Sequence, residues 1–288
     1  MAMIIDGKKV AREREESLSS RIKSLYEEHE INPSLAFLSA GADEASLSYQ
    51  RSQKKACERI GIVPKTINLD ASVQEPEILD TLFNLNEDDT VHAIIVTLPL
   101  PKGVDEERIL GAIELTKDVD CLNPSNRGRL AFGKSSFLPA TPAGITELLK
   151  AYEIPFAGKH VVIAGRGKAV GWPLAQILMS KGCDATVTVC HSRSGDLAQY
   201  TKKADILVAA IGKARFVDLN LVHENQVVID AGINAEETAS GWKIVGDVDF
   251  ELISDKVYAI TPVPGGVGPM TVAMLLSNVV QAAERRVL

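Results

Sequence analysis

The stretch HVVIAGRGKAVG, residues 160–171, decides the fold. Its apolar run Val161–Ala164 predicts a buried strand, and an amphipathic helix is expected to follow. Gly165, Gly167 and Gly171 stand between the two in the spacing G-x-G-x-x-x-G. Glycines at such a turn let backbone N–H groups approach a pyrophosphate at the positive N-terminus of the helix. Any strand-to-helix turn favours glycine. The turn therefore indicates a dinucleotide site only together with the strand before it and the helix and further strands after it.

Short apolar runs alternate with amphipathic stretches along the whole chain. After the glycine turn, the predicted strands are Ala185–Cys190, Ile206–Ala210, Val227–Ala231 and Tyr258–Ile260, and a closing helix is predicted at Met270–Arg286. Before it, strands are predicted at Leu35–Leu38, Thr66–Leu69 and Val91–Leu98, with helices at 45–60, 76–85 and 105–115. This alternation predicts parallel sheets. The expected fold class is α/β, with an N-terminal α/β domain, a Rossmann-type doubly wound domain and a ligand cleft between them.

The bulk composition narrows the function classes. A chain of 288 residues suggests about two domains. Its formal charge of −7 argues against a nucleic-acid partner held by a basic face. The four cysteines form no C-x-x-C pair and no His/Cys cluster with metal-ligand spacing, so we expect no metal and a reducing, cytoplasmic compartment. No signal peptide and no membrane span are predicted.

The end of the second predicted Rossmann strand indicates the cofactor. In dinucleotide-binding domains this position reads the adenosine ribose, and NAD-binding proteins place an Asp or Glu there. Here Ser192 and Arg193 follow the strand, and Arg166 lies in the glycine turn. Hydroxyls and cations suit a 2′-phosphate, so we expect NADP rather than NAD. The alternative is that both arginines are solvated loop residues.

Several further segments coincide with one family. They are ASLSY (45–49), KACERIGI (55–62), LPLPKG (98–103), KDVD (117–120), NPSNRGRL (123–130), PATPAGI (139–145), GDVDF (246–250) and TPVPGGVGPMT (261–271). On these segments the chain resembles the methylenetetrahydrofolate dehydrogenase/cyclohydrolase (FolD-type) family. The resemblance implies a folate-binding domain at 1–144, a Rossmann domain at 145–270, and a final helix, 271–288, that returns to the first domain. It also implies a homodimer.

The resemblance implies the reaction as well. Members oxidise 5,10-methylene-tetrahydrofolate to the methenyl form, with hydride passing to NADP, and most hydrolyse that product to 10-formyl-tetrahydrofolate. Tyr49 matches the tyrosine that orients the folate, Asp120 the aspartate that recognises the pterin ring, and Pro264, Gly265 and Gly266 the loop that lines the site. Singly, each residue has a structural alternative: a core aromatic, a loop cap or a turn. The predicted folate site also includes Thr97, Leu98 and Pro99, and the predicted cofactor site is Gly165, Arg166, Gly167, Val170, Gly171, Ser192, Arg193, Gly212, Ile233 and Thr271.

Four positions depart from the family pattern. Gln53 stands where the family has a lysine, four residues after the tyrosine and so on the same helix face. Thr97 stands for a glutamine, Cys121 for a glycine and Gly167 for a serine. Hydride transfer mainly needs alignment of donor and acceptor. Hydrolysis needs acid–base help, which a lysine of lowered pKa supplies and a glutamine does not.

We therefore predict an NADP-dependent dehydrogenase with weak or absent cyclohydrolase activity, with Tyr49, Gln53 and Asp120 as the catalytic residues. Three alternatives within the family remain open. The chain could be fully bifunctional, it could act on a modified folate, or it could bind folate or nucleotide without turnover. Outside the family, a two-domain dehydrogenase acting on an amino or hydroxy acid would fit the Rossmann half, but it would leave TPVPGGVGPMT (261–271) unexplained.

Overall fold

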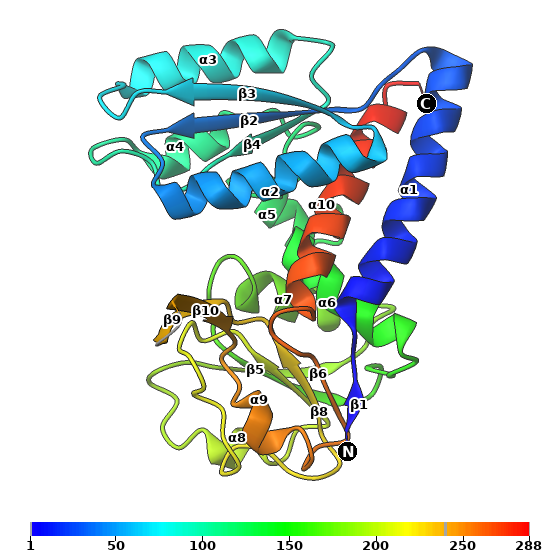
Figure 1. Ribbon diagram of the computed structural model, residues 1–288, viewed down its shortest axis with the longest axis vertical. Helices are drawn as coiled ribbons and strands as arrows, with labels where there is room; N and C mark the ends of the chain where they lie inside the picture. Colours follow the sequence, from blue (N-terminus) through cyan, green and yellow to red (C-terminus); the bar gives the residue numbers. More distant parts are fainter. Residues whose placement is uncertain (1, 239–240, 288) are drawn as a thin grey trace. The chain divides into compact units, whose positions relative to one another are not determined.

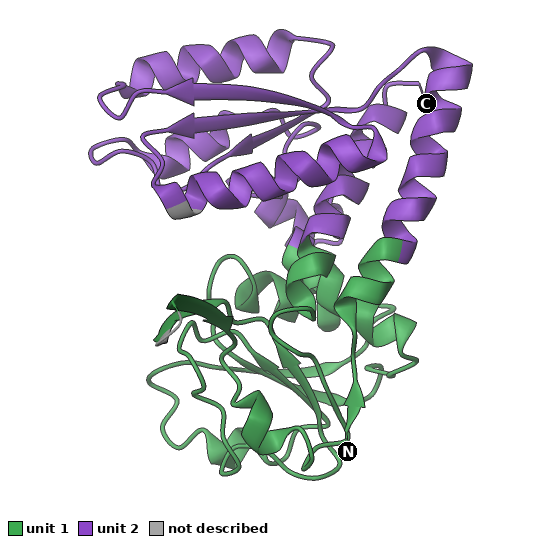
Figure 2. Cartoon of the chain, in the orientation of Figure 1, with its two compact units in different colours: residues 1–12, 141–271 green, residues 13–140, 272–288 purple. Residues whose placement is uncertain are grey.

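The computed structural model describes residues 2–238 and 241–287 (Figure 1), and the chain forms two compact units (Figure 2). Unit 1 comprises Met1–Arg12 and Thr141–Thr271, and unit 2 comprises Glu13–Ala140 and Val272–Leu288. The main difference from the predicted division is at the start of the chain, where the first twelve residues belong to the Rossmann unit. The predicted end positions 1 and 288 themselves lie outside the described residues.

Unit 2 contains a parallel three-stranded sheet in the order β3-β2-β4. Its strands and the two helices drawn on either side of them in Figure 1 are β2 (Ser34–Ala40), β3 (Val63–Leu69), β4 (Ala93–Val96), α2 (Glu44–Ile60) and α3 (Glu75–Glu87). Alternate residues of β2 face opposite sides. Leu35 and Phe37 join a core with α2, while Ala36 and Leu38 join a core with α3. Both faces of β2 and β4 are buried, which explains their mostly apolar sequences, whereas the edge strand β3 is partly exposed and carries polar residues.

The ends of α2 follow from local chemistry. The Asp43 side chain accepts a hydrogen bond from the Ser46 N–H at 2.7 Å and caps the first turn. Gly61, with φ of 94°, takes the left-handed conformation that ends the helix. The other helices of unit 2 are α4 (Glu106–Gly111), α5 (Pro124–Ala131), most of α1 (Gly7–His29) and most of α10 (Val267–Glu284). The Asn278 amide of α10 donates to the carbonyls of Val119 and Leu138, which ties this helix to the unit.

Unit 1 contains a six-stranded parallel sheet in the order β1-β11-β8-β7-β5-β6. In that order the strands are Met3–Ile4, Ala259–Ile260, Val227–Asp230, Ile206–Ala209, His160–Ala164 and Thr186–Cys190. The chain runs outward from β5 to β6 and then crosses back to β7, so the strand order reverses between β5 and β7. In open α/β sheets, ligands bind at the carboxyl ends of the strands at this reversal. The predicted doubly wound Rossmann architecture is therefore confirmed.

The remaining elements of unit 1 flank this sheet or project from it. They are α6 (Ala140–Ala151), α7 (Gly171–Leu178), α8 (Ala198–Thr201), α9 (Phe250–Ile253) and a hairpin of β9 (Asn234–Thr238) and β10 (Gly241–Val245). The sequence analysis did not predict α1, α5, α9, β1 or the hairpin. Among the described residues, no helix combines the length and apolar character needed to cross a bilayer.

Candidate active site

One face of α2 contacts the residues that follow β4. Ser46 and Gln50, one helical turn apart, lie on this face. The Ser46 hydroxyl donates to the Leu98 carbonyl at 3.2 Å, and the Gln50 side-chain amide donates to the Thr97 hydroxyl at 3.4 Å. Gln50 is only 4% exposed. The helix and the carboxyl end of the strand are thereby joined by polar contacts at the edge where a parallel sheet binds ligands.

Tyr49 lies on the same part of α2, with Gln53 one turn further along. Its ring is 48% exposed, while the Gln53 side chain is 7% exposed. Desolvation of the hydroxyl and the charge of Asp120 raise the pKa of Tyr49 to about 12, against a smaller lowering by a hydrogen bond from Gln53. The predicted i, i+4 neighbour of Tyr49 is therefore in contact with it. The charge that acts on the Tyr49 hydroxyl is a carboxylate and not an amine.

Asp120 is the residue near Tyr49 and Gln53 whose side chain ionises near neutral pH. Burial raises its pKa to about 6, and the charge of Asp118 adds to the rise. The charge of Arg127 and a hydrogen bond from the Ala140 N–H act in the opposite direction. The Asp120 carboxylate is therefore ionised at neutral pH but takes up a proton in mild acid. An ionised carboxylate accepts hydrogen bonds from an amide and an exocyclic amine, as pterin recognition requires.

The two polar residues before Val119 have structural roles. Lys117, 2% exposed, donates to the carbonyls of Leu85, Asn86 and Asp88 at 2.6–3.0 Å, so its ammonium group caps the C-terminal end of α3. Asp118 is equally buried and accepts hydrogen bonds from the backbone N–H groups of Leu122 and Asn123 and from the Asn126 amide. Lys117 thus does not supply the missing amine beside Tyr49.

Cys121 has a backbone conformation that favours glycine. Its φ is +57°, in the left-handed region, and its side chain is fully buried with Sγ 3.5 Å from the Ser135 hydroxyl. A side chain at positive φ carries steric strain that glycine avoids. The left-handed backbone at this position therefore explains why the family pattern has a glycine there.

The glycine turn after β5 is sterically constrained at two of its three glycines. A Cβ on Gly165 would lie 1.9 Å from the Ala210 carbonyl oxygen, and a Cβ on Gly171 would lie 1.9 Å from the Gly165 oxygen. A Cβ on Gly167 would meet nothing within 4 Å, so this position accepts a serine as readily as a glycine. The turn after β5 and the turn after β7 therefore touch, at the strand reversal where a pyrophosphate is expected to bind.

The turn after β6 lies at the same edge of the sheet. Ala164 and Cys190 are paired in register, so the residues that follow them start side by side. The His191 N–H donates to the Ser194 hydroxyl, and the Arg193 N–H donates to His191 Nδ1. Ser192 and Arg193 are exposed in this turn, as is Arg166 in the neighbouring one. Both arginines are accessible to a 2′-phosphate.

Two buried aspartates organise the remaining turns at this edge, and the sequence analysis gave neither of them a role. The Asp247 carboxylate is 0% exposed and accepts hydrogen bonds from the N–H groups of Ile211, Gly212 and Lys213. Asp230, at the end of β8, accepts from the N–H groups of Gly232, Asp247 and Val248, and burial raises the pKa of Asp230 to about 6. Asp247 lies in the GDVDF motif, which was the available signal. Gly212 is thus held in place, while Ile233 is 66% exposed.

The loop after β11 carries the predicted Pro264, Gly265 and Gly266. The Lys8 N–H donates to the Gly265 carbonyl at 3.0 Å, and Gly265 has φ of +121°. Thr271, four residues into α10, donates to the Thr141 hydroxyl at 3.0 Å. These residues belong to unit 1 with the predicted cofactor residues, whereas Tyr49, Gln53, Thr97–Pro99 and Asp120 belong to unit 2.

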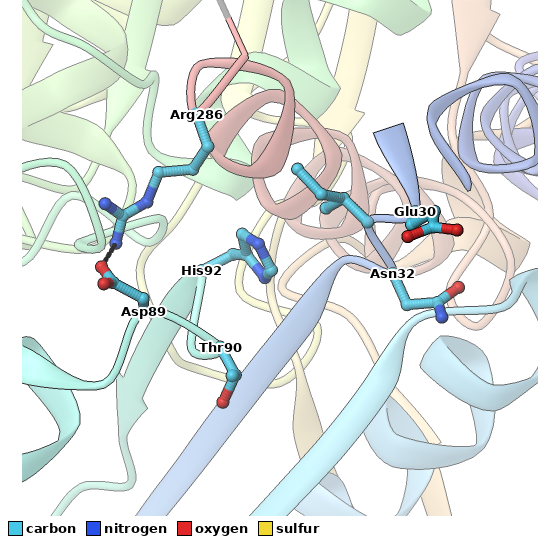
Figure 3. Close-up of a pocket in the computed structure, with 7 residues that line it drawn as sticks. Glu30, Asn32, Asp89, Thr90, His92 and Arg286 are labelled. Atoms are coloured by element: carbon cyan, nitrogen blue, oxygen red, sulfur yellow. Dashed lines mark ion pairs between the residues drawn. The ribbon is translucent and has the colours of Figure 1, made fainter. Parts of the chain in front are cut away.

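A pocket of about 380 Å³ lies at the opposite end of β4 from Thr97 (Figure 3). It is lined by Glu30, Ile31, Asn32, Asp89, Thr90, His92 and Arg286, and contains none of the predicted site residues. His92 immediately precedes β4, and its Nδ1 accepts a hydrogen bond from the Ser34 N–H at 3.2 Å. Burial lowers the pKa of His92 to about 4, so the ring is neutral at physiological pH.

Comparison with known proteins decides the family. The profile of the tetrahydrofolate dehydrogenase/cyclohydrolase catalytic domain matches residues 5–120, and that of the NAD(P)-binding domain of the same family matches residues 139–287. The chain belongs to the tetrahydrofolate dehydrogenase/cyclohydrolase family. It is 46% identical to the bifunctional protein FolD of Bacillus licheniformis over 286 residues, covering 99% of each chain. It is also 46% identical to FolD of Chloroherpeton thalassium, covering 98% of each.

Solved FolD structures agree with this assignment. The bifunctional FolD of Campylobacter jejuni superposes with a TM-score of 0.94 at 44% identity, covering 99% of this chain and 100% of that one. The FolD of Trypanosoma brucei, solved with NADP and an inhibitor, gives a TM-score of 0.93 at 35% identity, covering 99% and 98%. The family resemblance predicted from sequence is confirmed. The chain is an NADP-dependent methylenetetrahydrofolate dehydrogenase.

Proposed function

We propose that the chain carries both activities of its relatives. It oxidises 5,10-methylene-tetrahydrofolate to the 5,10-methenyl form with NADP, and it hydrolyses the methenyl form to 10-formyl-tetrahydrofolate. The observation that supports this most directly is the pairing of Tyr49 with Asp120, a ring and a carboxylate close enough for the charge of one to raise the pKa of the other. The names of relatives at 46% identity, all bifunctional FolD proteins, support the second activity beside the first.

In the proposed folate site, each group of unit 2 has one task. The exposed ring of Tyr49 stacks on the folate, and the ionised Asp120 accepts hydrogen bonds from the pterin amide and amine. Thr97, Leu98 and Pro99 form the wall at the end of β4. Pro264, Gly265 and Gly266 of unit 1 complete the set of substrate residues.

The residues of unit 1 fit a dinucleotide. A Cβ on Gly165 or Gly171 would collide with neighbouring backbone, so these glycines let the turn pack tightly, whereas the space beside Gly167 is open. Val170 and Gly212 border the two turns. Ser192, Arg193 and Arg166 would bind the ribose phosphate, and Ile233 and Thr271 would hold the nicotinamide end. When bound, NADP supplies the hydride acceptor. The protein residues align the folate carbon and exclude water during the transfer.

A second candidate is favoured by Gln53. Where the family pattern has a lysine, this chain has an amide that does not titrate, and the charge acting on Tyr49 is the carboxylate of Asp120. General acid–base help is typically worth about 10²–10⁴ in rate. The second candidate is therefore a dehydrogenase whose cyclohydrolase activity is weak or absent. The relatives favour the bifunctional enzyme over this candidate.

A pair of assays separates the two candidates. Methylene-tetrahydrofolate with NADP tests the dehydrogenase through the appearance of NADPH. Methenyl-tetrahydrofolate, given alone, tests the cyclohydrolase through the decay of its absorbance above the spontaneous rate. Decay that scales with protein concentration supports the bifunctional enzyme. NADPH formation with only spontaneous decay supports the second candidate, and neither signal from folded protein would contradict both.

The assembly and location of the enzyme are part of the proposal. Family resemblance supports a homodimer in the cytoplasm, and the reduced cysteines support a reducing compartment. Light scattering of the purified protein is expected to give twice the chain mass of 31.0 kDa. A monomer at assay concentrations would contradict the dimer.

A further inference from the structure

Gln50 is a buried polar residue to which neither the family resemblance nor the proposed mechanism gives a role. It follows Tyr49 directly and is 4% exposed, and its amide nitrogen donates to the Thr97 hydroxyl at 3.4 Å. A glutamine side chain loses rotamer freedom and hydration when it is buried, so its burial needs a compensating contact. The contact observed here ends on a residue of the proposed folate site.

The direction of this hydrogen bond determines what Thr97 presents to a ligand. A threonine hydroxyl has one proton and two acceptor lone pairs. Because the Gln50 amide donates to the oxygen, the proton of Thr97 points away from Gln50 and is available to another acceptor. The Thr97 N–H already donates to the Leu38 carbonyl at 2.8 Å, which fixes the backbone of this residue. The backbone and the side chain of Thr97 are therefore both fixed, and its hydroxyl proton is left to donate to another group.

The family pattern has a glutamine at position 97, which places a side-chain amide at the end of β4. In this chain Gln50 of α2 supplies the side-chain amide instead, and Thr97 at the end of β4 supplies a short hydroxyl side chain. Gln50 and Gln53 are thus two buried, uncharged polar residues of α2, and Gln50 contacts Thr97.

We propose that Gln50 is a positioning residue of the folate site, whose buried amide holds Thr97 so that the Thr97 hydroxyl donates a hydrogen bond to the reactive region of the bound folate. This inference rests on the proposed function, because it requires folate beside Thr97. It does not require the cyclohydrolase, since the same hydrogen bond aligns the folate carbon for hydride transfer. Gln50 itself touches Thr97 and not the folate.

The test compares single and double variants in the dehydrogenase assay. Gln50→Met keeps the length of the side chain and removes the donor, and Thr97→Val keeps the shape and removes the hydroxyl. Each is expected to lower kcat about three- to tenfold, with the KM for NADP unchanged, as expected for loss of one neutral hydrogen bond. The double variant is expected to lose no more than Thr97→Val alone, because the two residues act as one unit.

Three controls separate positioning from folding. Thr97→Ser keeps the hydroxyl and is expected to retain more activity than Thr97→Val. Gln74→Met makes the same exchange at an exposed glutamine of unit 2 and is expected to change nothing. Melting temperatures identify any variant that has lost its fold, and such a variant is replaced by Gln50→Leu.

Two results would overturn the inference: losses that multiply in the double variant, or a Gln50→Met protein as active as Gln74→Met. Binding of tetrahydrofolate by calorimetry is measured on the same variants. A wild type that binds folate without turnover would contradict the proposed function, and the coupling of Gln50 to Thr97 would still be read from the affinities.

Discussion

Gln53 lies one helical turn from Tyr49 on α2 and lowers the pKa of its hydroxyl, whereas the carboxylate of Asp120 is the charge that raises it. An amide, a phenol of raised pKa and a carboxylate therefore stand where the family pattern has a lysine beside the tyrosine. Such a set positions a ring well but has no group that takes a proton from water at neutral pH except Asp120. The predictions below follow from this arrangement and from the residues that support it.

Restoring the lysine alone is expected to raise the cyclohydrolase only slightly. A lysine at 53 needs the glutamine of the family pattern at 97, and we expect that longer side chain to meet Gln50, which is buried and already lies 3.4 Å from the Thr97 hydroxyl. The triple variant Gln50→Val/Thr97→Gln/Gln53→Lys is expected to hydrolyse methenyl-tetrahydrofolate at least tenfold faster than the wild type. The double variant that keeps Gln50 is expected to gain less, and equal gains would show that Gln50 does not occupy this space.

Asp120 is expected to set the lower pH limit of folate binding. Its pKa is about 6, so the KM for folate rises as the pH falls through 6, while the KM for NADP stays constant. Asp120→Asn is expected to raise the folate KM about tenfold or more at pH 7.5 and to remove this pH dependence. Arg127→Leu removes a charge that lowers the pKa, so its KM profile is expected to shift to higher pH. An unchanged profile in both variants would contradict this role.

The same carboxylate has a predictable effect on stability. The pKa of Asp120 is higher in the folded chain than the ordinary value of 3.8, so between about pH 4 and 6 the folded state binds a proton that the unfolded state does not. Its contribution to the free energy of unfolding therefore falls as the pH rises through this window. Without substrate, Asp120→Asn is expected to be at least as stable as the wild type at pH 7.5. Urea denaturation of both proteins at pH 7.5 and within the window of about pH 4 to 6 measures this.

Cys121 offers a test of backbone strain. A protein with glycine at a given position is usually less stable than one with alanine, by up to about 1 kcal/mol. The φ of +57° at position 121 reverses this order. Cys121→Gly is expected to be more stable than Cys121→Ala by about 1 kcal/mol in urea denaturation. Because both variants lose the buried thiol, their difference isolates the backbone. A more stable alanine variant would contradict the assignment of strain.

Arg193 is expected to carry the preference for NADP. Arg193→Ala is expected to raise the KM for NADP about tenfold or more, with little effect on the KM for NAD. Arg166→Ala tests the second exposed arginine in the same way. Lys168→Ala, exposed in the same turn as Arg166, serves as the control for general loss of positive charge. A parallel loss with both cofactors would show that Arg193 does not read the 2′-phosphate.

Lys117 is expected to be structural in spite of its place in a family motif. Lys117→Met leaves three carbonyls at the end of α3 without their donor, so the free energy of unfolding is expected to fall by about 2–4 kcal/mol. The kcat per folded molecule is expected to stay within twofold of the wild type. Lys102→Met, at an exposed lysine, is the control and should leave the stability within about 0.5 kcal/mol.

The sequence predicted the elements whose patterns are strong in themselves. The continuously apolar strands and the glycine turn at 165–171 were identified because buried parallel strands and tight turns leave few alternatives. The helix α1 was missed because its exposed face is crowded with charges, and β1 is too short to show a pattern. The roles of Gln50, Asp230 and Asp247 depend on partners far away in the chain, such as Thr97 for Gln50. Such long-range hydrogen bonds leave no local sequence pattern from which they could be predicted.

The pairing of β1 with β11 has a consequence for how the protein is made. Met3 and Ile4 emerge from the ribosome long before their neighbours Ala259 and Ile260 are synthesised. At about 5–20 residues per second, the leading strand waits on the order of ten seconds or more for its place in the sheet. The Rossmann unit therefore closes only once Ile260 is available, whereas all three strands of the β3-β2-β4 sheet lie between Ser34 and Val96. Nascent chains that have released β4 but not yet β11 should therefore be more resistant to protease over β2–β4 than over Met3 and Ile4.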